Sequence, residues 1–307
     1  MTDRRSFLVS AGAFGTFSAV SLCGCAFKRA GRKPVARFGM VTDIHYADIP
    51  PDPKRHTIIG RRFYRESRFK LDEAVAVFNR RDLDFAIELG DFKDFTRNRS
   101  ETLACLDEIE TSFSAFKGPR YHVLGNHDFD CLTEADLFSR LVNDRELMSS
   151  GHYTFMVNGI TFVVLDACYD SNLDHYSENN PWDDANVPPE ELIWLEQVLR
   201  DAEGPAVVFC HQRLDPFADR RHLVRNAQAV RTVIERSRRV KAVITGHQHN
   251  GAVNEYKGIA YYSLRALVCE TGEGSNSFAE TEVFADGSIA VTGWQRALSC
   301  AAGTGPT

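Results

Sequence analysis

The sequence has no internal repeat, no low-complexity tract and no long run of strongly apolar residues. A modest apolar stretch from Phe7 to about Leu22 is rich in Ala, Gly and Ser, and it is too weak to cross a membrane as a helix. Hydrophobic residues make up 43% of the chain and charged residues 25%, which is ordinary for a globular protein. This composition is therefore not that of a disordered chain.

Positive charge is also not in excess. The chain has 36 Lys and Arg against 42 Asp and Glu, a formal net charge of −6 and a sequence pI near 5.9. Nucleic-acid-binding proteins usually carry a basic face or a high pI, so no nucleic acid is expected as a partner. The mild acidity says little about a substrate, because bound metal ions can reverse the local field of a site.

Cysteine pairs with metal-binding spacing are missing as well. The chain has eight cysteines, and none of those after residue 25 forms a CxxC pair. A structural zinc site built on thiolates is therefore not indicated. Cys168 and Cys210 lie in or beside apolar runs, which is typical of small buried hydrophobes. An oxidising compartment would allow disulfides, and the sequence leaves their pairing open.

Residues 1–24 are interpreted as a signal peptide. Arg4 and Arg5 directly precede Ser6-Phe7-Leu8, which is typical of the twin-arginine class, whose cargo crosses the membrane already folded. The alternative is a chance arginine pair on a disordered tail. The segment from Leu22 to Cys25 resembles a bacterial lipoprotein cleavage box and predicts a lipid anchor on Cys25. The alternative is ordinary cleavage nearby, which gives a soluble periplasmic product.

Export machinery is therefore an expected partner. The protein is expected to be periplasmic or to be anchored on the outer side of the membrane. Residues 25–35 are short and basic and are predicted to be a linker. Residues 36–298 are predicted to form one domain, and residues 299–307 a C-terminal tail.

Strands and helices alternate along this domain. Apolar spacing predicts helices over 66–79, 100–116, 189–202 and 227–236, with Ser100 as the N-cap of the second. Apolar runs predict strands over 36–42, 84–89, 121–124, 153–157, 160–165, 206–210, 240–245, 253–256, 259–263, 280–284 and 288–292. The order predicts an α/β fold of the α+β type, in which two mixed sheets pack together and are flanked by helices.

Five of the predicted strands end in polar motifs. In chain order these are Asp43-Ile-His45, Gly90-Asp91-Phe-Lys-Asp94, Gly125-Asn126-His127-Asp128, His211 and Gly246-His247-Gln-His249. In α/β sheets the carboxyl ends of strands collect ligands, because the loops there converge on one crevice. Coincidence does not account for all five motifs in these places, whereas His122 and His152 are interpreted as satisfied core residues.

The motifs resemble the calcineurin-like metallophosphoesterase superfamily, whose pattern is DxH, GDxxD, GNH[DE], H and GHxH in that order. The resemblance covers roughly residues 36–295 and implies a four-layer αββα sandwich with a two-metal centre at the strand ends. Phosphoester hydrolysis needs neutralised phosphate oxygens and an activated water, which two metals about 3.5–4 Å apart supply together. A carboxylate is needed to bridge cations so close, and Asp91 is the natural bridge.

The resemblance also implies how the ligands divide between two divalent metal ions. The first ion would be held by Asp43, His45, Asp91 and His249. The second would be held by Asp91, Asn126, His211 and His247. Imidazole, carboxylate and amide groups together suit Mn²⁺, Fe or Zn²⁺, and a metal-bound hydroxide would attack phosphorus in line with the leaving oxygen.

Four further residues are assigned supporting parts. By the resemblance His127 stabilises the transition state or protonates the leaving group, and Asp128 is expected to orient it through a carboxylate–imidazole bond. Asp94 supports a ligand from behind or is a plain helix N-cap. Arg265 follows the strand over 259–263 and either clamps a phosphate or forms a surface salt bridge.

Some stretches are similar to one group of the superfamily, the manganese-dependent ADP-ribose/CDP-alcohol diphosphatases. They include Asp43-Ile-His-Tyr-Ala-Asp48, Phe63-Tyr-Arg-Glu-Ser67 and Ser275-Asn-Ser-Phe278. This implies a preference for Mn²⁺ and a phosphorylated small-molecule substrate, including nucleotide diphosphate-linked compounds. Members of that group often have Gln where this chain has His45, which puts metal preference and substrate range in doubt.

Nearby aromatic residues leave two interpretations open. They could stack a nucleobase or pack in the core and at the rim of the site; they are Tyr46, Phe63, Tyr169 and Trp182. The predicted function is hydrolysis of phosphate ester or diphosphate bonds. The alternatives are a non-catalytic metal-binding surface lipoprotein, and a nuclease or phosphodiesterase with the same two-metal site.

Overall fold

The computed structural model describes residues 32–51, 61–178 and 180–302. The predicted signal peptide and Cys25 lie outside these ranges. Within them, no helix has the length and apolar character needed to span a membrane. The cysteines in this part of the chain are all free thiols: Cys105, Cys131, Cys168, Cys210, Cys269 and Cys300.

The first sheet joins the N-terminal part of the domain to its C-terminal part. Its strands run in the order β14 (Cys300–Ala302), β13 (Ile289–Gln295), β12 (Ser277–Val283), β1 (Ala36–Val41), β2 (Phe85–Glu88) and β3 (Arg120–His122). The pairs β1–β2 and β2–β3 are parallel, whereas β12, β13 and β14 pair antiparallel. Parallel strands need crossover connections, and the helices between them supply these.

The second sheet is built from the middle of the chain. Its strands run in the order β10 (Ala252–Tyr256), β11 (Ile259–Ser263), β9 (Val240–Thr245), β8 (Ala206–Cys210), β7 (Ile160–Val164) and β6 (Tyr153–Val157). The inner strands β7, β8, β9 and β11 are parallel and mostly apolar, because both faces of this sheet are covered. The edge strands β6 and β10 alternate between more exposed and less exposed residues.

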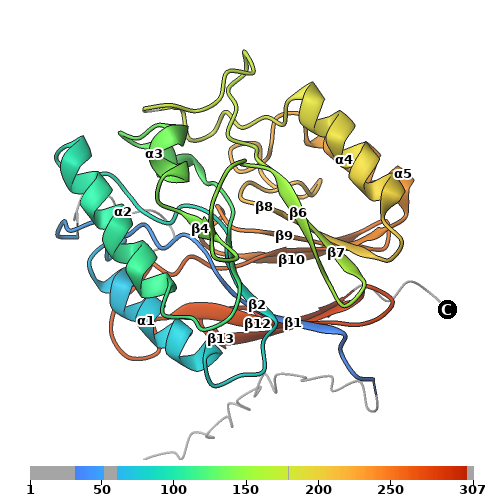
Figure 1. Cartoon of the computed structure of the whole chain (residues 1–307), viewed down its shortest axis with the longest axis horizontal. Coiled ribbons are helices and arrows are strands. Elements are labelled where there is room, and N and C mark those ends of the chain that lie inside the picture. The colour runs from blue at the N-terminus through green and yellow to red at the C-terminus, as the bar shows by residue number, and fades with distance from the viewer. Residues whose placement is uncertain (1–31, 52–60, 179, 303–307) are drawn as a thin grey trace, which may run out of the picture.

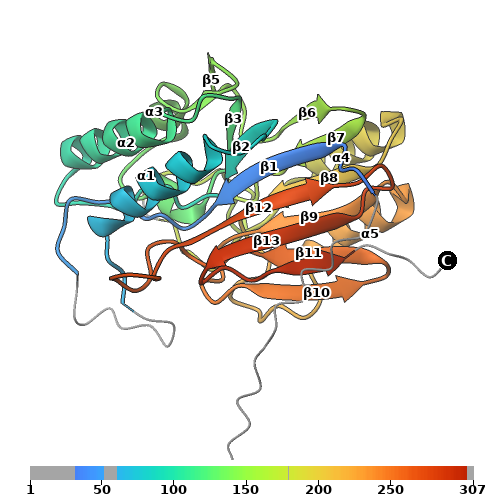
Figure 2. The ribbon, with the colours of Figure 1, turned by 90° about the horizontal axis from the view of Figure 1, so that it is seen from below.

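Helices cover the outer face of each sheet, as Figures 1 and 2 show. Helices α1 (Glu66–Phe78) and α2 (Arg99–Phe113) pack on the first sheet, and α4 (Pro189–Asp201) and α5 (Ala227–Ser237) pack on the second. The sheets meet through an aromatic core, in which Phe38 of β1 stacks on Phe85 at 4.8 Å and meets the edge of Phe209 of β8 at 5.6 Å. The predicted four-layer αββα sandwich is confirmed.

Small elements and boundaries differ from the sequence prediction. Helix α2 begins after Asn98, whose side chain accepts the N–H of Glu101, so Ser100 is not the N-cap. The region expected to be a tail from residue 299 contains β14, which pairs with β13 and extends the first sheet. The structure adds a 3₁₀ turn η1 (Asn126–Phe129), helix α3 (Glu134–Phe138) and a small sheet of β4 (Val142–Asn143) and β5 (Glu146–Leu147).

Candidate metal centre

Hydrogen bonds join the carboxyl ends of neighbouring strands, both within the first sheet and between the two sheets. The N–H of Asp43, just after β1, donates to the carbonyl of Gly90 after β2 at 3.0 Å. The imidazole Nδ1 of His211, just after β8, bonds the carbonyl of Leu89 at 2.7 Å. The expected convergence of the polar motifs is therefore built into the way the two sheets meet.

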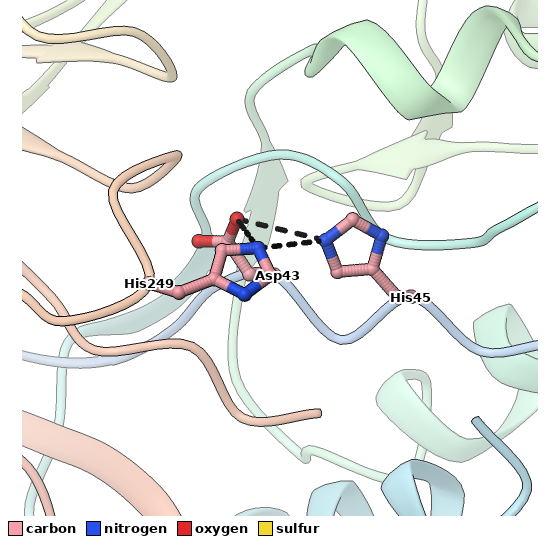
Figure 3. A group of neighbouring side chains, drawn as sticks. All are labelled: Asp43, His45 and His249. Carbon is pink, nitrogen blue, oxygen red and sulfur yellow. Dashed lines mark hydrogen bonds and ion pairs between the residues drawn. The ribbon is translucent and has the colours of Figure 1, made fainter. Parts of the chain in front are cut away.

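The first cluster contains Asp43, His45 and His249, whose ligand atoms all lie within 4.8 Å of one another. Figure 3 shows the three side chains pointing toward a common place. The Nε2 atom of His249 lies 3.3 Å from Asp43 Oδ1, and the Nε2 atoms of His45 and His249 are 3.2 Å apart. All three side chains are buried, so water does not screen their charges.

The second cluster contains Asp91, His211 and His247, and it meets the same distance limit. His211 Nε2 lies 3.1 Å from Asp91 Oδ2, and the same carboxylate oxygen lies 3.5 Å from His45 Nε2 in the first cluster. Asp91 therefore stands between the clusters, where a bridging ligand is needed.

The chemistry of these atoms fits divalent cations. Asn126 Oδ1 and His247 Nε2 are buried and have no hydrogen-bond partner among the described residues. Burial and the charge of His211 hold the pKa of His247 well below its usual value, and burial lowers the pKa of His249 to about 4. An imidazole nitrogen that carries no proton offers a lone pair to a cation, and the Nε2 atoms of His45 and His249 lie only 3.2 Å apart.

The two carboxylates of the clusters, Asp43 and Asp91, are held in their ionised form. Burial would raise the pKa of Asp43, but the nearby His249 and His45 hold it well below the usual value. Burial likewise opposes ionisation of Asp91, but the charges of His211, His127 and His45 lower its pKa well below the usual value. Carboxylates bind cations in their ionised form, so the low pKa values of Asp43 and Asp91 suit a two-cation centre.

Four of the candidate ligands occupy the left-handed region of backbone space. The φ angles are 49° for Asp43, 46° for His45, 57° for Asp91 and 61° for His247. A residue other than glycine in this region costs about 1–3 kcal/mol, and such residues concentrate at functional sites. The hydrogen bonds of the loops hold these conformations, since His247 N–H donates to Asp43 Oδ2 at 3.0 Å and His45 N–H to the Asp91 carbonyl at 2.8 Å.

Further groups hold the ligand side chains from behind. Asp94 Oδ2 lies 3.2 Å from His45 Nδ1 and also accepts Arg62 Nη1 at 3.2 Å, so Asp94 is not a helix N-cap. The Sγ atom of Cys269 lies 3.4 Å from His249 Nδ1. Contacts of this kind fix which ring nitrogen is free to bind a metal.

His127 is oriented by a residue that the sequence analysis did not single out. Its Nδ1 lies 2.6 Å from Oδ2 of Asp130, and its ring centroid is 4.9 Å from that of His45. Burial opposes protonation of this imidazole, but Asp91 and the bond to Asp130 raise its pKa above the usual value. In a 3₁₀ turn the side chains at i and i+3 lie on one side, and this spacing was the available signal.

The expectation that Asp128 orients His127 is wrong. The Asp128 carboxylate points into the loop after β2, where it accepts the N–H groups of Asp91 at 3.0 Å and Phe92 at 2.9 Å. It also accepts the N–H of Gly125 at 2.8 Å in its own loop. Asp128 therefore joins the two loops that carry Asp91 and Asn126.

Arg265 lies among backbone carbonyls. Its Nε donates to the carbonyl of Asn250 at 2.7 Å and its Nη1 to the carbonyl of Arg296 at 3.2 Å. Arg265 thus ties two loops together, and the phosphate clamp stays a prediction. Trp182 and His222 lie beside the second cluster instead, with ring centroids 5.7 Å and 5.3 Å from that of His247. Trp182 is one of the aromatic residues for which the sequence left nucleobase stacking or packing at the rim open, whereas no motif marked His222.

Comparison with known proteins agrees with this geometry. The family model of the calcineurin-like phosphoesterases matches residues 36–251. The chain belongs to this family. It is therefore a metal-dependent hydrolase of phosphate ester or diphosphate bonds with a centre for two divalent metal ions.

Individual relatives match most of this chain. The chain is 30% identical over 293 residues to a manganese-dependent ADP-ribose/CDP-alcohol diphosphatase from Oryza sativa subsp. japonica, covering 83% of this chain and 90% of that protein. It is 28% identical to the protein of the same name from Arabidopsis thaliana, covering 88% of this chain and 97% of that protein. A crystal structure of a dimetal phosphatase from Danio rerio has the same fold, with a TM-score of 0.78 at 24% identity, covering 88% of this chain and 99% of that one.

Proposed function

We propose that this calcineurin-like phosphoesterase is a manganese-dependent diphosphatase that cleaves the diphosphate group of nucleotide-linked small molecules. The observation that carries the proposal is the placement of Asp91 between two ligand clusters. The similarity to diphosphatases over most of both chains supports the substrate class and the metal. Mixed carboxylate, amide and imidazole donors suit Mn²⁺.

Two divalent cations, when bound, neutralise the phosphate oxygens and activate a water molecule. Asp43, His45 and His249 would hold one of them, and His211, His247 and Asn126 the other, with Asp91 shared. The rigid loops around these ligands fix the reacting phosphate relative to the protein, which is a large part of catalysis in phosphoryl transfer.

His127 is the group of this chain that can move a proton to the leaving oxygen. Asp130 engages its Nδ1, which leaves Nε2 as the nitrogen available for proton transfer. A side chain that protonates a leaving group contributes roughly 10²–10⁴-fold in rate. His127 is partly exposed beside buried ligands, so a substrate bound at the metals can reach it.

The activity test is hydrolysis of ADP-ribose, CDP-choline, p-nitrophenyl phosphate and bis-p-nitrophenyl phosphate with added Mn²⁺. We expect the two diphosphates to have the highest kcat/KM. Asp91→Ala should lose both metal and activity, whereas His127→Ala should keep metal and lose rate. Parent rates in both variants would contradict these roles, and binding of Mn²⁺ without hydrolysis of any substrate would favour a non-catalytic metal-binding protein.

We also propose that the protein is exported and carried on the outer side of the membrane. The support is the Arg4-Arg5 pair before Ser6-Phe7-Leu8 and the segment that ends at Cys25. Mass spectrometry of the protein purified from a membrane fraction should find a diacylglyceryl group on Cys25 as the first residue. A chain that still begins at Met1 would contradict both export and lipidation.

A further inference from the structure

Lys93 is a buried lysine that belongs to none of the ligand clusters. Its side chain lies in the interior with no exposed surface. The Nζ atom donates to the carbonyl oxygen of His127 at 2.7 Å and to that of Asp130 at 2.6 Å. A buried ammonium is costly unless polar groups compensate it, and these two carbonyls are its compensation.

The two carbonyls mark the ends of one short turn. The N–H of Asp130 donates to the carbonyl of His127 at 3.2 Å, and the side chains of the same two residues meet at 2.6 Å. The ammonium of Lys93 therefore fixes both backbone units from which the His127–Asp130 contact extends. A shift of this turn would move the imidazole relative to the metal ligands, since the turn begins at Asn126.

Lys93 also has acidic residues around it. Burial lowers the pKa of Lys93, and the carboxylates of Asp128, Asp130 and Asp94 oppose this shift. The backbone N–H of Lys93 also points at Asp128 Oδ1, at 3.4 Å. Lys93 thus links the loop after β2, which carries the bridging Asp91, to the turn after β3, which carries His127.

A second buried lysine makes the same kind of contact with backbone carbonyls, but on a different loop. Lys70 of α1 donates to the carbonyls of Leu267 and Cys269 at 2.9 Å and of Glu270 at 2.8 Å. It holds the loop after β11 and makes no such bond to the His127 turn. Lys70 is therefore a matched control with the same chemistry on another loop.

We propose that Lys93 is a positioning residue for the reaction and acts by holding His127 where it can protonate the leaving oxygen. The proposal rests on the proposed role of His127. It predicts that loss of the Lys93 amine matters most when the leaving group needs a proton. Metal binding should change little, because the amine contacts none of the metal ligands' side chains that the structure describes.

The test compares two nucleotide esters that differ in the basicity of the leaving oxygen, thymidine 5′-phenyl phosphate and thymidine 5′-p-nitrophenyl phosphate. The p-nitrophenolate leaves without help from an acid, whereas the phenolate benefits from one. Lys93→Met should lower kcat for the phenyl ester by roughly 10- to 100-fold and for the p-nitrophenyl ester by less than about 3-fold. Lys70→Met should leave the ratio of the two rates unchanged.

A double variant makes the test decisive. Because Lys93 acts through His127, His127→Ala combined with Lys93→Met should be no slower than His127→Ala alone, within about 3-fold. If the rate losses of the two single variants multiply in the double variant, Lys93 has a general structural role and the inference is overturned. Equal rate losses on both esters in Lys93→Met would have the same meaning. If Lys93→Met does not fold, Lys93→Gln keeps one donor to a carbonyl and should show a smaller selective loss on the phenyl ester.

The outcomes also separate the inference from the proposed function. A selective loss in His127→Ala without one in Lys93→Met would overturn the inference alone. If His127→Ala hydrolyses both esters at the rates of the parent protein, His127 does not protonate the leaving group, and the inference about Lys93 is overturned as well. Mn²⁺ content, measured on each purified variant, should match the parent, and a drop in Lys93→Met would mean that the lysine acts on the metal centre instead.

Discussion

Replacement of Asp128 by asparagine tests whether this residue joins two loops of the metal centre. One carboxylate oxygen accepts the N–H groups of Gly125 and Asp91, and the other accepts those of Phe92 and Lys93. An asparagine of the same shape has a single acceptor oxygen. Its amide NH₂ must face one of the two pairs of N–H donors.

The size of the effect follows from these contacts. With the amide oxygen kept toward Gly125 and Asp91, the N–H of Phe92 loses a bond of 2.9 Å and that of Lys93 one of 3.4 Å. A buried donor left without a partner costs about 1–3 kcal/mol. Burial and the nearby Asp91 raise the pKa of Asp128, so removing its charge offsets part of that cost. We expect Asp128→Asn to lower the free energy of unfolding by about 2–3 kcal/mol.

The measurement is urea unfolding of the metal-free protein, followed by circular dichroism, together with Mn²⁺ titration by calorimetry. Asp128→Asn should also weaken Mn²⁺ binding, because the loops carrying Asp91 and Asn126 lose their link. Asp130→Asn is the control: its carboxylate contacts the His127 ring, so it should change stability by less than about 1 kcal/mol. Equal stability and equal Mn²⁺ affinity in Asp128→Asn and the parent would refute the reasoning.

Two further perturbations have clear signs. A Cβ at Gly125 would lie 2.2 Å from the backbone nitrogen of Asp91, so Gly125→Ala should lower Mn²⁺ affinity by roughly tenfold or more in calorimetry, and unchanged affinity would contradict this. The second perturbation is a change of pH. Burial alone would lower the pKa of His122, but Glu110 and Glu88 raise it to about 9. Burial raises the pKa of Glu88 to about 7. Both folded values exceed the unfolded ones, so this stability is complete at low pH and is lost as pH rises through about 7 and 9. Unfolding of metal-free protein should therefore become easier by about 2–3 kcal/mol between pH 6 and 10, and His122→Gln should flatten this slope.

The architecture could be predicted from the sequence wherever the apolar pattern of a segment matches the burial of the element that it forms. The run Ala206–Cys210 is apolar at every position and forms β8 with the predicted bounds, since this inner strand is covered on both faces. Strand β14 escaped prediction because Cys300–Ala302 has no alternating pattern. It exists by pairing with β13, and such a pairing depends on a partner that local sequence does not identify.

The convergence of the candidate metal ligands could be predicted for a related reason. They follow strands whose carboxyl ends must meet, so order and spacing were enough to bring Asp43, Asp91 and His211 together. The carboxylate that contacts His127 could not be predicted from its neighbour in the sequence, Asp128. The 3₁₀ turn places Asp130 on the side of the imidazole and turns Asp128 toward the preceding loop, and the turn type depends on backbone bonds that the sequence does not display.

The ligand His45 carries a last prediction about metal preference. Its Nε2 faces His249 and Asp91, while its Nδ1 is held by Asp94 at 3.2 Å. Glutamine has one amide oxygen for the metal and no second ring nitrogen for Asp94. Amide oxygen is a harder ligand than imidazole, so His45→Gln should weaken Zn²⁺ roughly tenfold more than Mn²⁺ in competition titrations followed by metal analysis. His152→Gln, at a histidine whose ring contacts that of Trp194 at 4.7 Å, should leave the ratio unchanged. Equal weakening of both metals would mean that Asp94, rather than the imidazole itself, sets the affinity of this position.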